Sequence, residues 1–141
     1  MIPKGTGSNK ACTVISNDVA WRLLAAAISE RGALPGIQLA SCWPSYTGMK
    51  KFIPDCVDHN LKMYREVASQ LTKKEVSSVF YYLMEGTRMA VDAGFKHVQL
   101  HAAHGYLFNL ILDSRFSQCS DFALKELNFW SQYVAELGVE S

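Results

Sequence analysis

The sequence lacks the features that would place it at once in several large classes of protein. Its 14 Lys and Arg residues balance 13 Asp and Glu residues, so the net charge is only +1. Nucleic-acid binding through bulk charge needs a concentrated basic surface, which this balance does not supply. The longest apolar runs fall far short of the ~20 residues of a membrane helix, and residues 1–5 begin no apolar signal sequence. We therefore expect no nucleic-acid partner, no membrane partner and a cytoplasmic location.

Common metal-binding and nucleotide-binding motifs are missing as well. The four cysteines, Cys12, Cys42, Cys56 and Cys119, are scattered and form no C-x-x-C pair. Reduced thiols are the expectation for such a chain. No G-x-G-x-x-G, P-loop or G-x-S-x-G segment occurs. Any catalytic activity must therefore use a different arrangement of residues.

The residues that are present predict one α/β domain. A chain of 141 residues with 49% hydrophobic and 19% charged residues is long enough to bury a core. Apolar periodicity predicts five helices, the first beginning at 16–18 with Asn17 or Asp18 as N-cap and ending near 31, the others over about 58–69, 72–93, 106–112 and 122–137. Thr72 and Glu75 have the spacing of a capping box. Two short runs, 36–40 and 96–101, predict strands, which should be parallel because helices separate them.

The densest polar cluster lies at the end of the second predicted strand. His97, Gln99 and His101 share one face of this strand because side chains alternate with a period of two. His101 and His104 flank its carboxyl end, where parallel α/β proteins bind ligands. Two neutral imidazoles there can donate hydrogen bonds to one ligand, and Tyr106 can deliver a proton.

Gln38 is the second polar feature, because it interrupts the apolar run of the first predicted strand. A buried amide must find hydrogen-bond partners, and a ligand heterocycle is one of them. Backbone groups are another, and histidines satisfied by carbonyl oxygens and a Tyr106 packed in the core are equally plain interpretations. The spacing of His97, His101 and His104 resembles a metal-ligand set, but no carboxylate lies among them and we predict no metal. The residues by themselves do not name a reaction.

Three segments, in the same order along the chain, resemble the old yellow enzyme family. Residues 93–107 (A-G-F-K-H-V-Q-L-H-A-A-H-G-Y-L) are similar to its fourth barrel strand and the loop that follows. Residues 36–40 (G-I-Q-L-A) resemble its third strand, and 71–76 (L-T-K-K-E-V) resemble the start of the helix before the fourth. The resemblance covers about 1–121 and leaves 122–141 as a divergent helical tail. It implies that the chain, 1–141, is a partial (β/α)8 TIM barrel with parallel strands, about strands two to four.

The resemblance also implies a function, an FMN-dependent oxidoreductase. Such an enzyme takes hydride from NAD(P)H onto its flavin and passes it to an activated alkene, for example an enone. The resemblance implies that Gln38 contacts the flavin pyrimidine edge and that His101 and His104 hold and polarise the acceptor's carbonyl oxygen. It assigns Tyr106 the role of proton donor. The expected cofactors are FMN and NAD(P)H, and the expected partner is a small alkene or enone-like molecule.

The chain also departs from the family pattern. A complete barrel of this type needs about 250 residues, and an incomplete one exposes unpaired strand edges. We therefore expect a fragment or split piece, completed by another chain or by a second copy. The family's His-x-Gly-Arg is replaced by Ser-Cys-Trp-Pro at 41–44, and its N-x-R-x-D by Ser-Gln-Cys-Ser-Asp at 117–121. These replacements keep open the alternative of a non-catalytic remnant or interaction module.

Overall fold

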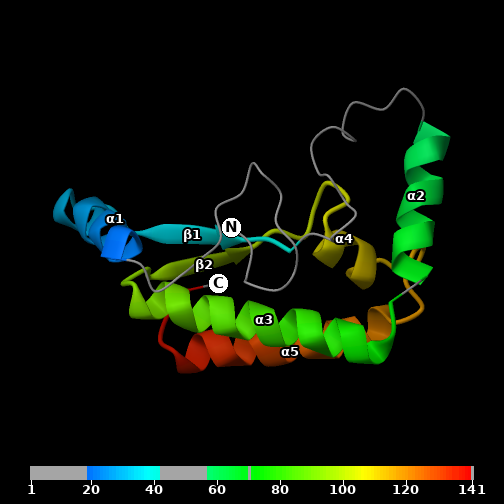
Figure 1. Ribbon diagram of the computed structural model, residues 1–141. Coiled ribbons are helices and arrows are strands. Elements are labelled where there is room, and N and C mark those ends of the chain that lie inside the picture. Colours follow the sequence, from blue (N-terminus) through cyan, green and yellow to red (C-terminus); the bar gives the residue numbers. More distant parts are fainter. Residues whose placement is uncertain (1–18, 42–56, 70, 141) are drawn as a thin grey trace.

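The computed structural model describes residues 19–41, 57–69 and 71–140 (Figure 1). Helices and strands follow one another along the described chain in the order α1 (Val19–Glu30), β1 (Gly36–Leu39), α2 (Val57–Ser69), α3 (Lys73–Asp92), β2 (His97–Leu100), α4 (Leu107–Leu112) and α5 (Ser120–Glu136). Each of the predicted helices and strands is confirmed, with ends that differ by a few residues. The predicted N-caps of the first helix, Asn17 and Asp18, lie outside the described residues.

The two strands form a parallel sheet, which confirms the α/β class. Their register runs from Gly36 opposite His97 to Leu39 opposite Leu100. Backbone hydrogen bonds extend the ladder at both ends, because Lys96 N–H donates to the Pro35 carbonyl and His101 N–H donates to that of Leu39, each at 2.8 Å. The carboxyl ends of β1 and β2 therefore meet at the same edge of the sheet.

A third segment begins to pair with β2 on the side away from β1. Val98 N–H donates to the Glu140 carbonyl at 2.9 Å, and Glu140 N–H donates to the Lys96 carbonyl at 3.1 Å. His97 and Glu140 form an isolated parallel bridge. In space the order across the sheet is thus β1, β2 and then the backbone at 140.

Helix α3 forms where local signals predict it. Thr72 is its N-cap, and its side chain accepts the Glu75 N–H at 3.3 Å while Thr72 N–H donates to the Glu75 carboxylate at 2.7 Å. This reciprocal pair is the predicted capping box, and the backbone hydrogen bond from Thr72 lowers the pKa of Glu75. The helix ends at Ala93, and Gly94 follows with a φ of +100°.

The core lies between the sheet and the long helices α3 and α5, which run side by side against the same face of the sheet (Figure 1). Phe80 of α3 meets Phe108 of α4 edge to face, with ring centroids 5.4 Å apart. Thr87 and Trp130 join α3 to α5 inside the core, because the Trp130 indole N–H donates to the Thr87 hydroxyl at 2.9 Å. The largest fully buried side chains are Phe80, Phe95, Phe108, Leu39, Leu83, Leu107, Leu110, Ile111, Val76 and Val98.

Helix α1 is less buried than its apolar pattern predicts. Of the stripe formed by Trp21, Leu24, Ala25 and Ile28, only Ala25 is fully buried, and Leu24 is 47% exposed. The apolar face of α1 is therefore only partly covered by the described residues. The reason is position, because α1 lies at one end of the sheet, away from α5 (Figure 1). No helix within the described ranges is long and apolar enough to span a membrane.

Candidate active site

The exposed face of the sheet carries a pair of amide side chains. Gln38 of β1 and Gln99 of β2 are partners in the register, and Gln38 Nε2 donates to Gln99 Oε1 at 2.7 Å. Both side chains are exposed, so the expectation of a buried Gln38 is wrong. Alternation turns Ile37 and Leu39 toward the core, while no described helix covers the face that carries the amides. The pair therefore presents amide groups to whatever approaches this face.

The loop after β2 is tied to the end of β1. His101 N–H donates to the Leu39 carbonyl at 2.8 Å, and Leu107 N–H donates to the Ser41 carbonyl at 3.1 Å. These two bonds hold the loop at its start and at its finish. The residues between them are consequently carried on rigid backbone at the carboxyl edge of the sheet.

Two successive residues with left-handed backbone shape this loop. His104 has a φ of +58° and Gly105 a φ of +68°. Gly105 N–H donates to Asn109 Oδ1 at 2.9 Å, which closes the turn against α4. A Cβ atom on Gly105 would lie 2.5 Å from the Tyr64 hydroxyl oxygen of α2, so glycine is required here by conformation and by space.

The loop brings together three of the predicted site residues. The ring centroid of His101 lies 4.7 Å from that of Tyr106 and 5.4 Å from that of His104. Tyr106 is only 8% exposed, His101 is half-buried and His104 is exposed. Exposure within the cluster therefore increases from the Tyr106 phenol, which lies against the core, to the His104 imidazole at the surface.

Partial burial sets the protonation of His101. Desolvation, followed by the charge of the neighbouring His104, lowers the pKa of His101 below its ordinary value. At neutral pH its imidazole is therefore uncharged, with one N–H to donate and one nitrogen that accepts. The one N–H of the uncharged imidazole can donate a hydrogen bond to a carbonyl oxygen.

The described residues do not assemble a metal site. They contain no group of three or more His, Cys, Asp or Glu side chains that could hold an ion. His97, His101 and His104, the set whose spacing resembles metal ligands, are all within the described ranges and do not gather. The short strand places His97 at its start and His104 in the turn beyond its end.

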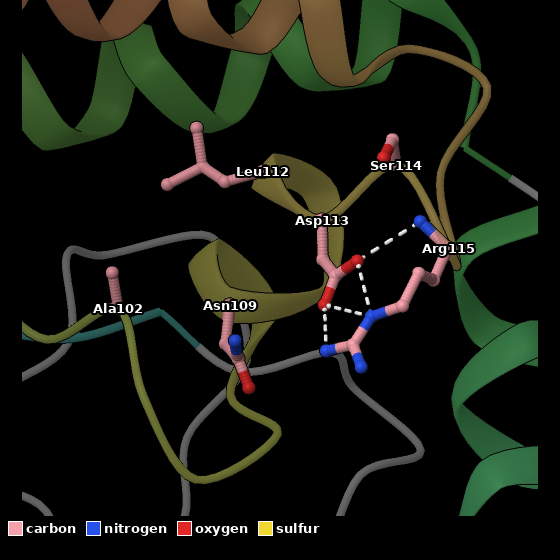
Figure 2. A pocket seen from close by; sticks show the side chains of 6 residues that line it. All are labelled: Ala102, Asn109, Leu112, Asp113, Ser114 and Arg115. Carbon is pink, nitrogen blue, oxygen red and sulfur yellow. Dashed lines mark hydrogen bonds and ion pairs between the residues drawn. The ribbon is translucent and has the colours of Figure 1, made fainter.

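Sequence reasoning missed two features near this edge of the sheet. The first is the Ser41 hydroxyl, which is 1% exposed and has no hydrogen-bond partner among the described residues. Buried polar atoms without partners are rare, and the only sequence signal was that Ser41 replaces a family histidine. The second is a pocket of about 460 Å³ beside the loop, lined by Ala102, Asn109, Leu112, Asp113, Ser114 and Arg115 (Figure 2). The Asp-x-Arg spacing at 113–115 is the local signal that could have found it, but the sequence reasoning did not use it.

Comparison with known proteins identifies the family to which this chain belongs. Residues 3–123 match the family model of the FMN oxidoreductases described as the NADH:flavin oxidoreductase / NADH oxidase family. The chain belongs to this family, and the resemblance predicted from its motifs is confirmed. The family is one of oxidoreductases, and FMN and NAD(P)H are the cofactors specified by its description and by the names of its members.

The individual relatives are bacterial enzymes much longer than the matched region. The NADPH dehydrogenase of Geobacillus thermodenitrificans (strain NG80-2) is 33% identical over 89 residues, which are 60% of this chain and 25% of that protein. The Bacillus subtilis (strain 168) protein named "Probable NADH-dependent flavin oxidoreductase YqiG" is 31% identical over 111 residues, 75% of this chain and 29% of that protein. The chain thus spans about a quarter of the length of the relatives it matches. No solved structure matches it.

The described residues fit the polar edge of a flavin and an oxygen-bearing acceptor. The Gln38–Gln99 pair places amide groups on the face of the sheet that no described helix covers, and amide groups are what a heterocycle with alternating polar atoms requires. The unpartnered Ser41 hydroxyl lies at the end of the same strand. The imidazoles of His101 and His104 are adjacent at the next strand end. The donor set is neutral and polar, which suits a flavin ring and a carbonyl oxygen.

Proposed function

We propose that this chain carries the acceptor-binding part of an FMN-dependent NAD(P)H oxidoreductase that reduces an activated alkene. In this proposal β1 and β2 are the third and fourth strands of a (β/α)8 barrel. The observation that carries it is the cluster of His101, His104 and Tyr106 at the carboxyl end of β2, beside Gln38 on β1. Ligands of parallel α/β sheets bind at this end of the strands.

The two imidazoles act as hydrogen-bond donors to the carbonyl oxygen of the acceptor. His101 is suited to this role because its pKa is lowered and the ring is uncharged at neutral pH. Donors that are already in place cost no reorganisation when negative charge develops on the oxygen. The bound FMN supplies the hydride chemistry, and the protein orients the acceptor against it.

Tyr106 delivers the proton that completes reduction of the alkene. Its ring packs edge-on against His101, with centroids 4.7 Å apart, so the phenol sits next to the oxygen-binding group. A positioned general acid of this kind contributes a factor of about 10²–10⁴ to the rate. Gln38 holds the pyrimidine edge of the flavin through its amide, with Gln99 as its neighbour in the sheet.

The rest of the barrel has to accompany these residues for turnover. The matched relatives are about four times longer than the aligned region, which leaves length in them for further strands. We propose that such strands, from this polypeptide, another chain or a second copy, close the sheet around β1 and β2. A cytoplasmic location stays a prediction.

Flavin binding tests the proposal directly. The purified chain is titrated with FMN, and binding is followed by the visible absorption and fluorescence of the flavin. We expect Gln38→Ala to weaken binding about tenfold, the effect of losing one to two hydrogen bonds. The matched control is Gln132→Ala, since Gln132 is exposed on α5 and away from the sheet edge.

Turnover with NADPH and cyclohexenone is measured on the same variants once the remaining strands have completed the barrel. We expect Tyr106→Phe to lower kcat by about 10²-fold or more while leaving FMN affinity unchanged. If FMN does not bind even in excess, the catalytic proposal fails for this chain, and the non-catalytic remnant or interaction module takes its place. Equal losses in Gln38→Ala and Gln132→Ala would refute the assignment of Gln38.

A further inference from the structure

The pocket beside the loop at 101–106 contains an ion pair between Asp113 and Arg115 (Figure 2). Asp113 accepts the Arg115 Nε–H at 3.0 and 3.1 Å, the Nη2–H at 2.6 Å and the Arg115 backbone N–H at 2.9 Å. The carboxylate side chain is 17% exposed, whereas the guanidinium-bearing side chain is 77% exposed. A largely buried anion therefore anchors an outward-facing cation.

The anchoring fixes which part of the guanidinium remains available. Asp113 takes the edge formed by Nε and Nη2, and the Phe116 ring lies 5.5 Å from the central carbon of the guanidinium. A guanidinium has five N–H groups, and the outer edge formed by Nη1 and Nη2 still has one parallel N–H on each nitrogen. This edge matches a carboxylate or a phosphate, both of which bind arginine through two oxygens.

The other polar groups of the pocket are donors as well. Asn109 uses its Oδ1 to accept the Gly105 N–H, which leaves its Nδ2 with two N–H groups. Ser114 contributes a hydroxyl on an exposed residue. The Asp113 carboxylate is directed at Arg115, whose hydrogen bonds lower the pKa of Asp113 and keep it charged. The lining therefore combines the Arg115 guanidinium, positioned by Asp113, with the neutral hydrogen-bond donors of Asn109 and Ser114.

We propose that this pocket binds the anionic group, a carboxylate or a phosphate, of a small molecule through the outer edge of Arg115. The pocket adjoins the loop at 101–106, since Ala102 follows His101 directly and Asn109 holds the turn at Gly105. The identity of that ligand rests on the proposed function, whereas the anion contact itself is independent of flavin.

Two ligands of the proposed reaction carry such a group. One is an unsaturated acid, whose carboxylate would occupy Arg115 while its alkene lies near Tyr106. The other is the nicotinamide nucleotide, whose phosphates would occupy the same edge. Both present the same chemistry to the guanidinium, and the experiment separates them.

The test is a titration of the isotope-labelled chain, without flavin, followed by amide and arginine side-chain NMR shifts. The probes are inorganic phosphate, crotonate, NADPH and NADH. The variants are Arg115→Gln, which removes the cation, and Arg115→Lys, which keeps the charge and loses the paired donors. Arg88→Gln is the matched control, because Arg88 is an ion-paired arginine on the outer side of α3, bonded to Glu85 and Asp92. The unchanged remainder of each spectrum reports that the variant is folded.

We expect phosphate to shift the Arg115, Asn109 and Ser114 signals. Its affinity should fall about fivefold or more in Arg115→Gln and about twofold in Arg115→Lys, with no change in Arg88→Gln. An Arg115-dependent preference for NADPH over NADH identifies the nucleotide's extra phosphate as the anion. Arg115-dependent binding of crotonate without that preference identifies the acceptor's carboxylate.

Other outcomes overturn the inference. If no probe shifts the pocket signals, or if Arg115→Gln and Arg88→Gln weaken binding equally, the pocket is not an anion site. Failure of FMN binding in the separate titration, with phosphate binding at Arg115 intact, would refute the proposed function and leave the anion site standing. Absence of phosphate binding at Arg115, with FMN binding intact, would refute the anion site and leave the proposed function standing.

Discussion

Replacing Gly105 by alanine tests how the loop at 101–106 is seated against α2. The added Cβ atom would lie 2.5, 2.6 and 2.7 Å from the Oη, Cζ and Cε1 atoms of Tyr64. The φ of +68° adds a second cost of about 1–2 kcal/mol, because a Cβ atom is disfavoured in the left-handed region. Overpacking typically costs a further 1–3 kcal/mol. We therefore expect Gly105→Ala to lower the free energy of unfolding by about 2–5 kcal/mol.

Gly32→Ala separates the two contributions. Gly32 has a φ of +76°, and an added Cβ atom there would meet no atom within 4 Å. It should therefore show the conformational cost of about 1–2 kcal/mol alone. Urea unfolding followed by circular dichroism measures both variants on the same scale.

A double-mutant cycle with Tyr64→Ala identifies the contact itself. Tyr64 also packs edge-on against Phe116, at 5.7 Å between centroids, so Tyr64→Ala is destabilising by itself. In that background Gly105→Ala should cost no more than Gly32→Ala, because the obstructing ring is gone. Equal costs for Gly105→Ala and Gly32→Ala in the unmodified chain would refute the reasoning, since α2 would then not be seated on the loop.

Two further predictions concern the core and the site. Thr87→Val should destabilise the chain by about 1–3 kcal/mol more than Thr87→Ser, because valine leaves the buried Trp130 indole N–H without its acceptor. The urea midpoints of the two variants measure this difference. A valine variant as stable as the serine variant would contradict the prediction. The lowered pKa of His101, caused by burial and then by His104, means that the unfolded chain binds this proton more readily. Stability should therefore fall as the pH drops below about 6.5, and His101→Gln should flatten that dependence; an unchanged slope contradicts this assignment.

The sequence by itself determined the elements whose signals are local. Thr72 and Glu75 set the start of α3 because a capping box involves residues three apart, and the structure contains both of its hydrogen bonds. The alternation around Val98 predicted a strand with one polar face, and the histidine–tyrosine loop was recognisable from its motif. The grouping of His101, His104 and Tyr106 follows from the same short stretch, since six residues cannot spread far when both ends are tied to β1.

Tertiary structure alone decided which faces are covered. Gln38 is exposed and paired with Gln99 because α3 and α5 occupy the opposite side of the sheet, a choice that no pattern within β1 encodes. The apolar periodicity of residues 19–30 predicted a helix, but burial depends on what packs against that helix, and only Ala25 of α1 is fully buried.

The pocket at Arg115 also depends on tertiary structure, since its lining combines α4, the loop at 101–106 and the ion pair of Asp113 with Arg115. Periodicity and capping act over a few residues and can be read along the chain. Coverage and pocket formation depend on contacts between segments far apart in sequence, and these are settled only when the chain folds.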